Sequence, residues 1–176
     1  IYLTNASAVL MDGYGLDATA FGIAFAAVAV CSSAGNLLNS RLVRHLDLRR
    51  VTRSALVAAL ASALLALLLA WAGWGGVEAL VGALGLFFVA FGLVAANATT
   101  LALQPHGAIA GSASAALGFA QTVVPAAAGS VVAALYDGTA RPMLVATILL
   151  VLGCLLAAGR QVGGRRSQVD PDAARQ

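Results

Sequence analysis

Long stretches without charged residues alternate with short polar stretches along the chain. A helix of about 20 apolar residues is long enough to cross a bilayer. Residues 18–40 and 54–74 contain no Asp, Glu, Lys or Arg, and neither do residues 79–135. The last stretch is too long for one span, and proline and glycine interrupt it at residues 104–107. The pattern therefore predicts membrane-spanning helices at residues 18–40, 54–74, 79–103, 109–135 and 142–159.

The two ends of the chain differ from this pattern. Residues 1–11 are apolar but too short to span, and we interpret them as the outer end of a truncated first helix. The sequence begins with Ile1 and has no signal peptide with a basic start, so we expect it to be a fragment. Residues 160–176 are rich in Gly, Arg, Asp and Pro, which is typical of a disordered tail.

The composition indicates an all-α integral membrane protein. Hydrophobic residues make up 61% of the chain and charged residues only 10%, whereas soluble domains carry about a quarter charged residues. The net charge of +3 does not indicate a nucleic-acid partner, because the arginines gather mainly in two short zones without aromatic residues beside them. The lipid bilayer is the partner that this composition predicts.

The charges of the connections predict the orientation in the membrane. Five arginines lie in residues 41–53, and most of the others lie in the tail. Asp47 lies in the same loop as these five arginines, and the other four acids between spans fall on the other side, namely Asp12, Asp17, Glu78 and Asp137. Cytoplasmic loops of membrane proteins carry an excess of Lys and Arg. We therefore expect the arginine loop, the turn at 104–107 and the C-terminus to be cytoplasmic.

Catalytic and metal-binding patterns are missing from the sequence. Cys31 and Cys154 both lie in apolar runs, and no CxxC pair or Cys/His cluster accompanies them. No paired acids, Ser/His/Asp set or nucleotide-binding glycine loop is present. We expect no enzyme activity, no metal and no cofactor. No carboxylate lies inside a predicted span, so the chain has no intramembrane acid to carry a proton.

Several polar side chains and one proline fall inside the predicted spans. Polar groups at membrane depth need partners or water. Asn36, Asn97 and Gln121 are therefore candidates to line a substrate cavity, and hydrogen bonding between helices is the alternative role. Pro125 removes a backbone hydrogen bond within its span, and it serves either as a hinge or as an ordinary bend.

The stretch GNLLNSRLVRHLDLRR, residues 35–50, has internal order beyond its charge. It resembles the loop signature G-x-L-x-D-R-x-x-x-R-R of the major facilitator superfamily, and the matching residues are Gly35, Asn39, Arg41, Arg49 and Arg50. In that family the charges of this loop pair with helix ends and stabilise one conformation. Asn39 stands where an acid is usual, which weakens such a switch. A plain positive-inside loop is the alternative.

A second stretch is more specific. ANATTLALQPHGAIAGSASAALGFAQ, residues 96–121, resembles the Bcr/CflA drug-resistance branch of this superfamily, as does YGLDATAFGIAF, residues 14–25. The resemblance covers residues 1–158. It implies the C-terminal six-helix half of a twelve-helix transporter, from the end of helix 7 to helix 12. The arginine loop would then join helices 8 and 9, and the turn at 104–107 helices 10 and 11.

The resemblance also implies a function and a location. Members of this branch export drugs and other small amphipathic molecules from bacteria across the inner membrane by alternating access. The proton gradient drives them, and the proton-coupling acids lie in the N-terminal half, which would be the missing partner of this chain. The alternative is a non-transporting membrane protein, a stand-alone half that dimerises and plays a structural or interaction role.

Overall fold

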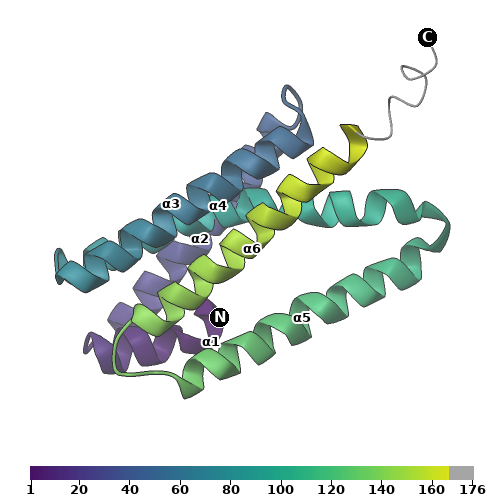
Figure 1. Ribbon diagram of the computed structural model, residues 1–176. Helices are drawn as coiled ribbons and strands as arrows, with labels where there is room; N and C mark the ends of the chain where they lie inside the picture. The colour runs from purple at the N-terminus through teal and green to yellow at the C-terminus, as the bar shows by residue number, and fades with distance from the viewer. Residues whose placement is uncertain (167–176) are drawn as a thin grey trace, which may run out of the picture.

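The structure, a computed structural model, describes residues 1–166, without the side chains of residues 106–108 and 160–166 (Figure 1). Its elements are α1 (Tyr2–Ser7), the π-helix η1 (Ala8–Gly13), α2 (Ala18–Leu42), α3 (Leu48–Ala72), α4 (Gly76–Leu103), the 3-10 helix η2 (Gln104–Ile109), α5 (Ala110–Ala134) and α6 (Arg141–Arg166). Five of these helices, α2 to α6, contain segments long and apolar enough to cross a membrane. The predicted all-α, multi-pass membrane architecture is therefore confirmed.

Three helices lie within three residues of the ranges expected from the sequence, namely α2, α4 and α5. Helix α3 differs, because it begins at Leu48 and not at residue 54. The expected span began at residue 54 because Arg53 and the residues before it are rich in charge. Arginine is nevertheless a good helix former, and its side chain reaches water from a helix end. Arg49, Arg50 and Arg53 therefore belong to the first turns of α3.

The helical segments at both ends of the chain are longer than the sequence predicted. The helical segment at the start continues to Gly13, two residues past the expected end. Helix α6 continues to Arg166, so residues 160–166 are helical, whereas the sequence predicted a disordered tail from residue 160. The rest of that predicted tail, residues 167–176, lies outside the described residues.

Local sequence explains where several helices begin and end. Asp17 caps α2, and its carboxylate accepts a 2.7 Å hydrogen bond from the Ala20 amide. Gly73 ends α3 in the left-handed conformation with a φ of 67°, which glycine adopts without steric cost. Pro142 lies in the first turn of α6, where its missing amide hydrogen has no helical partner to lose.

Helix packing is uneven across the molecule. Helix α4 lies between α2 and α3 and packs extensively against both, and α3 also packs against α6. Helix α5 has far less contact with this group. It meets α1 near its C-terminal end, and Tyr136 just beyond α5 donates a hydrogen bond to Ala8 of η1. Figure 1 shows α5 apart from α6 along much of its length. The larger part of the α5 surface is therefore exposed.

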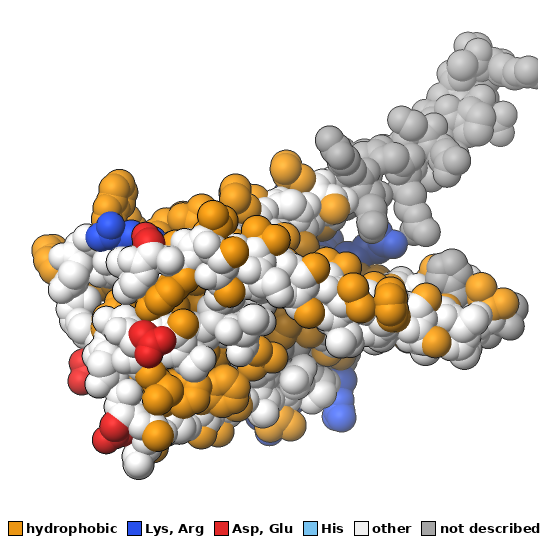
Figure 2. All heavy atoms as spheres, turned by 90° about the horizontal axis from the view of Figure 1, so that it is seen from below, with side chains coloured by type: hydrophobic (Ala, Val, Ile, Leu, Met, Phe, Trp, Pro, Cys, Tyr) orange, Lys and Arg blue, Asp and Glu red, His pale blue; other side chains and the backbone are white. Residues whose placement is uncertain are grey.

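The principal core lies at the end of the molecule where α2, α4 and α6 begin. Its fully buried members include Leu10, Leu80 and Leu144, which come from η1, α4 and α6. A much smaller cluster, formed by Val51, Ala55 and Leu93, lies near the arginine end. Figure 2 shows the acidic side chains of the viewed face gathered at one end of the molecule. We call the end that carries Asp12, Asp17, Glu78 and Asp137 the acidic end, and the opposite end, which carries residues 41–53, the arginine end.

Candidate functional site

Helices α2 and α4 cross with their backbones in contact. A Cβ atom added to Gly35 would collide with the backbone carbonyl of Val89 on α4. One added to Gly92 on α4 would likewise collide with the backbone of Ser32 on α2. Small residues permit such close approach between helices in a membrane. Gly35 of the predicted loop motif therefore lies at the crossing point of these two helices.

Asn39 and Asn97 form a buried contact one turn beyond this crossing. Asn39 Nδ2 donates a 2.8 Å hydrogen bond to Asn97 Oδ1. Only 1% of Asn97 is exposed, and Asn39 Oδ1 and Asn97 Nδ2 have no hydrogen-bond partner among the residues that the structure describes. Of the two roles considered for Asn97, the structure therefore shows the interhelical hydrogen bond, and the side chain does not reach an open surface.

The arginines of the motif surround the short connection between α2 and α3. Arg41 lies in the last turn of α2, where a cation interacts favourably with the helix dipole. Arg49 and Arg50 lie in the first turn of α3. All three side chains are exposed, and Asp47 stands at the N-cap of α3 without forming a side-chain cap. The motif is thus an exposed, strongly basic turn next to the buried asparagine pair.

Asn36 and Gln121 occupy exposed positions on different helices. Asn36 belongs to an exposed stripe on α2 that repeats every three or four residues and holds only small or polar side chains. Its members are Thr19, Gly22, Ala26, Ala29, Ser33, Asn36 and Ser40. Gln121 lies on α5, and its Nε2 donates a 3.3 Å hydrogen bond to Thr99 Oγ1 on α4. Asn36 and Gln121 are therefore both exposed, whereas Asn97 is buried between α2 and α4.

A group of phenylalanines lies on α4, about two to three helical turns before Thr99. Phe87, Phe88 and Phe91 contact one another with ring centroids 5.4 to 6.4 Å apart. The Tyr2 ring on α1 packs edge-on against Phe88 at 4.9 Å. Phe91 is 45% exposed, about two helical turns from Thr99. We name Phe87, Phe88, Phe91, Thr99 and Gln121 the aromatic–amide face.

The sequence interpretation did not identify these phenylalanines. They are spaced i, i+1 and i+4, which places them close together on a helix, in a span otherwise made of aliphatic and small residues. This local enrichment was the available signal. The two tryptophans, Trp71 and Trp74, are strongly exposed at the acidic end, where an interfacial aromatic belt would lie.

Pro125 lies inside α5, which continues without interruption from Ala110 to Ala134. Proline has no amide hydrogen, so the carbonyl four residues earlier, that of Gln121, loses its helical partner. Gln121 therefore presents both a side-chain amide and a backbone carbonyl at one exposed point. Pro125 as a hinge remains a prediction.

The aromatic–amide face offers a ligand hydrogen bonds and apolar contacts. Within the described part of the chain, no group of three or more His, Cys, Asp or Glu side chains is arranged to hold a metal ion. Cys31 and Cys154 are both free thiols. His45 is exposed in the connection between α2 and α3. The aromatic–amide face suits a ligand that is largely apolar and carries a few hydrogen-bonding groups or a positive charge.

The fold and composition together define an all-α, multi-pass membrane protein. Comparisons with models of known protein families, with curated proteins and with solved structures find no match for this chain. Any finer assignment rests on the residues themselves and on their arrangement.

Proposed function

We propose that the chain forms the C-terminal half of a proton-coupled secondary transporter of the major facilitator type. Such a transporter exports small amphipathic molecules by alternating access. The observation that carries this proposal is the aromatic–amide face, where exposed Phe91 and Gln121 lie at membrane depth on α4 and α5. Polar groups in a membrane mark a partner or a water-filled path. A second six-helix half opposite this face would complete the cavity.

The helix arrangement supports the proposal. Each half of a major facilitator transporter consists of two three-helix repeats of inverted topology. If α1 with η1, α2 and α3 form the first repeat, then α4, α5 and α6 form the second. In this pairing α1 corresponds to α4, α2 to α5 and α3 to α6. The repeat symmetry then relates the contact of α2 with α4 to a contact of α5 with α1, and both contacts are present. Each of them includes a glycine against the partner helix, Gly35 in one and Gly129 in the other.

Helices α2, α3, α5 and α6 all expose large apolar side chains, including Ile23 on α2 and Val124 on α5, but α2 and α5 expose small and polar side chains as well. Helices α3 and α6 expose large aliphatic residues such as Leu68 and Leu149, which suit contact with lipid tails. Helix α2 exposes its small and polar stripe, and α5 exposes Ser112, Gln121 and Thr122. In the proposed transporter, α2 and α5 contact the other half, while α3 and α6 face lipid.

The proposal includes an orientation. The arginine loop and the C-terminus lie in the cytoplasm of a bacterial cell, and the protein lies in the inner membrane. The proton gradient supplies the energy, and the groups that bind the proton belong to the N-terminal half. The chain would contribute substrate contacts and the movement of one wall.

Efflux of a fluorescent cationic dye tests this function. Cells that express the intact protein are loaded with ethidium, and the decrease in fluorescence is followed with and without a protonophore. We expect protonophore-sensitive efflux that Gln121→Leu and Phe91→Ala each reduce severalfold. Phe119→Ala is the matched control, because Phe119 is exposed on the opposite face of α5 from Gln121. Efflux no faster than in cells without the protein would contradict the proposal.

The small and polar stripe of α2 also favours a second candidate function, that of a self-associating half without transport. Close packing against a second copy would cover the stripe as well as a different half would. Oxidative cross-linking of Ser33→Cys, in a protein that lacks Cys31 and Cys154, separates the two. A disulfide-linked dimer of identical chains would favour self-association. Monomers together with dye efflux would favour the transporter.

A further inference from the structure

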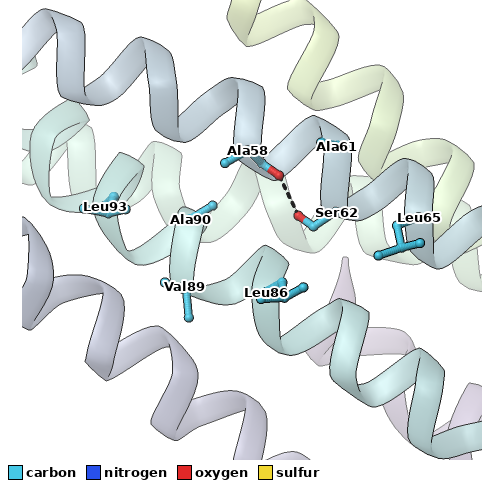
Figure 3. A pocket seen from close by; sticks show the side chains of 8 residues that line it. All are labelled: Ala58, Ala61, Ser62, Leu65, Leu86, Val89, Ala90 and Leu93. Carbon is cyan, nitrogen blue, oxygen red and sulfur yellow. Dashed lines mark hydrogen bonds between the residues drawn. The ribbon is translucent and has the colours of Figure 1, made fainter.

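An open groove runs along the outside of the bundle between α3 and α4. It encloses about 430 Å³ and is lined by Ala58, Ala61, Ser62, Leu65, Leu86, Val89, Ala90 and Leu93 (Figure 3). The walls contain exposed Leu65 and Leu86, while Ala90 is buried in the floor. Small alanines opposite leucines leave room for a narrow apolar object.

The groove has no free polar group to offer a ligand. Ser62 is the only lining side chain with a hydrogen-bonding atom, and its hydroxyl donates to the carbonyl oxygen of Ala58 at 2.8 Å on its own helix (Figure 3). It also donates to the Ala59 carbonyl at 3.1 Å. A polar ligand would lose its hydration here without compensation. A hydrocarbon chain meets no such cost, so the lining selects for an aliphatic occupant.

Arg50 lies on the line of the groove toward the arginine end. It precedes Ala58, Ala61 and Leu65 by about two, three and four helical turns, which places it on the same side of α3. Its side chain is exposed. The surrounding residues 41–53 contain five arginines and one acid, Asp47, so this end of the groove is strongly positive. Asp47 forms no side-chain cap, and this leaves the first-turn amides of α3 available to an anion.

The spacing between Arg50 and the far end of the groove matches one membrane leaflet. Fifteen residues of helix separate Arg50 from Leu65, a rise of about 22 Å. Half of a bilayer, headgroups included, is about 20 to 22 Å thick. An acyl chain in the groove therefore places its phosphate at the level of Arg50.

We propose that the groove and Arg50 form a binding site for an anionic phospholipid of the leaflet that faces the arginine loop. One acyl chain lies against Ala58, Ala61 and Leu65, and the phosphate pairs with the Arg50 guanidinium. The positive charge gives this groove a preference for an anionic headgroup that the apolar surfaces far from the arginine end lack. The inference is independent of the transport proposal, since it uses only α3, α4 and the basic turn.

Native mass spectrometry of the intact protein tests the site. The protein is delipidated in detergent and mixed with equal amounts of phosphatidylglycerol and phosphatidylcholine that have identical acyl chains. We expect at least a threefold preference for retained phosphatidylglycerol. Arg50→Gln should reduce its binding about fivefold, since one arginine near the membrane surface contributes about 1 kcal/mol toward an anionic lipid. Ala61→Trp should fill the groove and reduce the retention of both lipids.

Two controls keep the result specific. Arg141→Gln removes the same charge at the opposite end of the bundle, and Ala27→Trp adds the same ring to an exposed position on α2. Both controls should retain phosphatidylglycerol like the unchanged protein. Equal retention of the two lipids by the unchanged protein would overturn the proposal. The proposal would also be overturned if Arg141→Gln reduced phosphatidylglycerol retention as much as Arg50→Gln does. The same holds if Ala61→Trp left the retention of both lipids unchanged.

Discussion

Asn39 and Asn97, which are 58 positions apart in the sequence, share a buried hydrogen bond between α2 and α4, with 2.8 Å between Nδ2 of the first and Oδ1 of the second. The bond lies next to the backbone contact at Gly35 and Gly92. The end of α2 that carries Arg41 is therefore held against α4 by a polar contact as well as by close packing. In the proposed transporter, this contact makes the basic turn move with α4.

Replacing Asn97 by alanine should destabilise the protein by about 1 kcal/mol. Hydrogen bonds between helices in membranes are worth about 0.6 kcal/mol on average and up to about 1.7 kcal/mol. The free energy of unfolding is measured by titrating the detergent-solubilised protein with sodium dodecyl sulfate. Asn39→Ala should cost a similar amount, and the double variant should cost less than the sum. Strict additivity would show that the two amides do not interact. Thr100→Ala is a control, because its hydroxyl bonds to its own helix.

A methyl group at Gly35 should separate α2 from α4. The added Cβ collides with the Val89 carbonyl, which belongs to a helix backbone and cannot rotate away. Inserting a methyl into close packing costs about 1 to 3 kcal/mol. Gly35→Ala is therefore expected to lower the free energy of unfolding by that amount. Gly22→Ala is the matched control on the same helix, since a Cβ there meets no atom within 4 Å. A loss in Gly22→Ala equal to that in Gly35→Ala would contradict this explanation.

Tyr136 should make the stability decrease at alkaline pH. Its hydroxyl donates a 2.8 Å hydrogen bond to the Ala8 carbonyl, and burial, followed by Asp12 and Asp137, raises the pKa of this phenol above 10. A raised pKa means that the fold favours the neutral phenol. The stabilisation is thus complete below pH 10 and is lost as the pH rises through the folded-state pKa. At neutral pH the hydrogen bond contributes about 1 kcal/mol.

Thermal unfolding between pH 8 and pH 11 measures this contribution. Tyr136→Phe should unfold at a lower temperature than the unchanged protein at pH 8, and this difference should shrink as the pH approaches 11. Tyr14→Phe, at the same end of the molecule, serves as the control. A difference for Tyr136→Phe that is constant with pH would mean that the phenol does not titrate in the fold.

Cysteine labelling should place the arginine turn in the cytoplasm. In a protein without Cys31 and Cys154, Arg44→Cys and Glu78→Cys each introduce one exposed thiol at opposite ends of the bundle. A membrane-impermeant maleimide should label Glu78→Cys in intact cells and Arg44→Cys only in inverted vesicles, as the positive-inside rule requires. The reverse pattern would overturn the proposed orientation.

Particular helices show how far the sequence alone could lead. The apolar runs located α2, α4 and α5 within three residues, because a spanning helix satisfies its own backbone hydrogen bonds and its length follows the bilayer thickness. The start of α3 was missed by six residues, since charge marks the edge of the hydrocarbon and not the end of a helix. The role of Asn97 stayed open, because its partner Asn39 comes from another helix.

The sequence by itself determined the membrane class, the five long spans and the segregation of arginines from acids. These depend on the length, hydropathy and charge of single segments in contact with the bilayer, which local composition specifies. Only the tertiary structure decided that Gly35 meets the backbone of Val89 and that Gln121 on α5 meets Thr99 on α4. It alone aligned Arg50 with the apolar groove between α3 and α4. The physical reason is that helix packing joins residues far apart in the chain, and the small residues that allow it are too frequent here to indicate which helices pair.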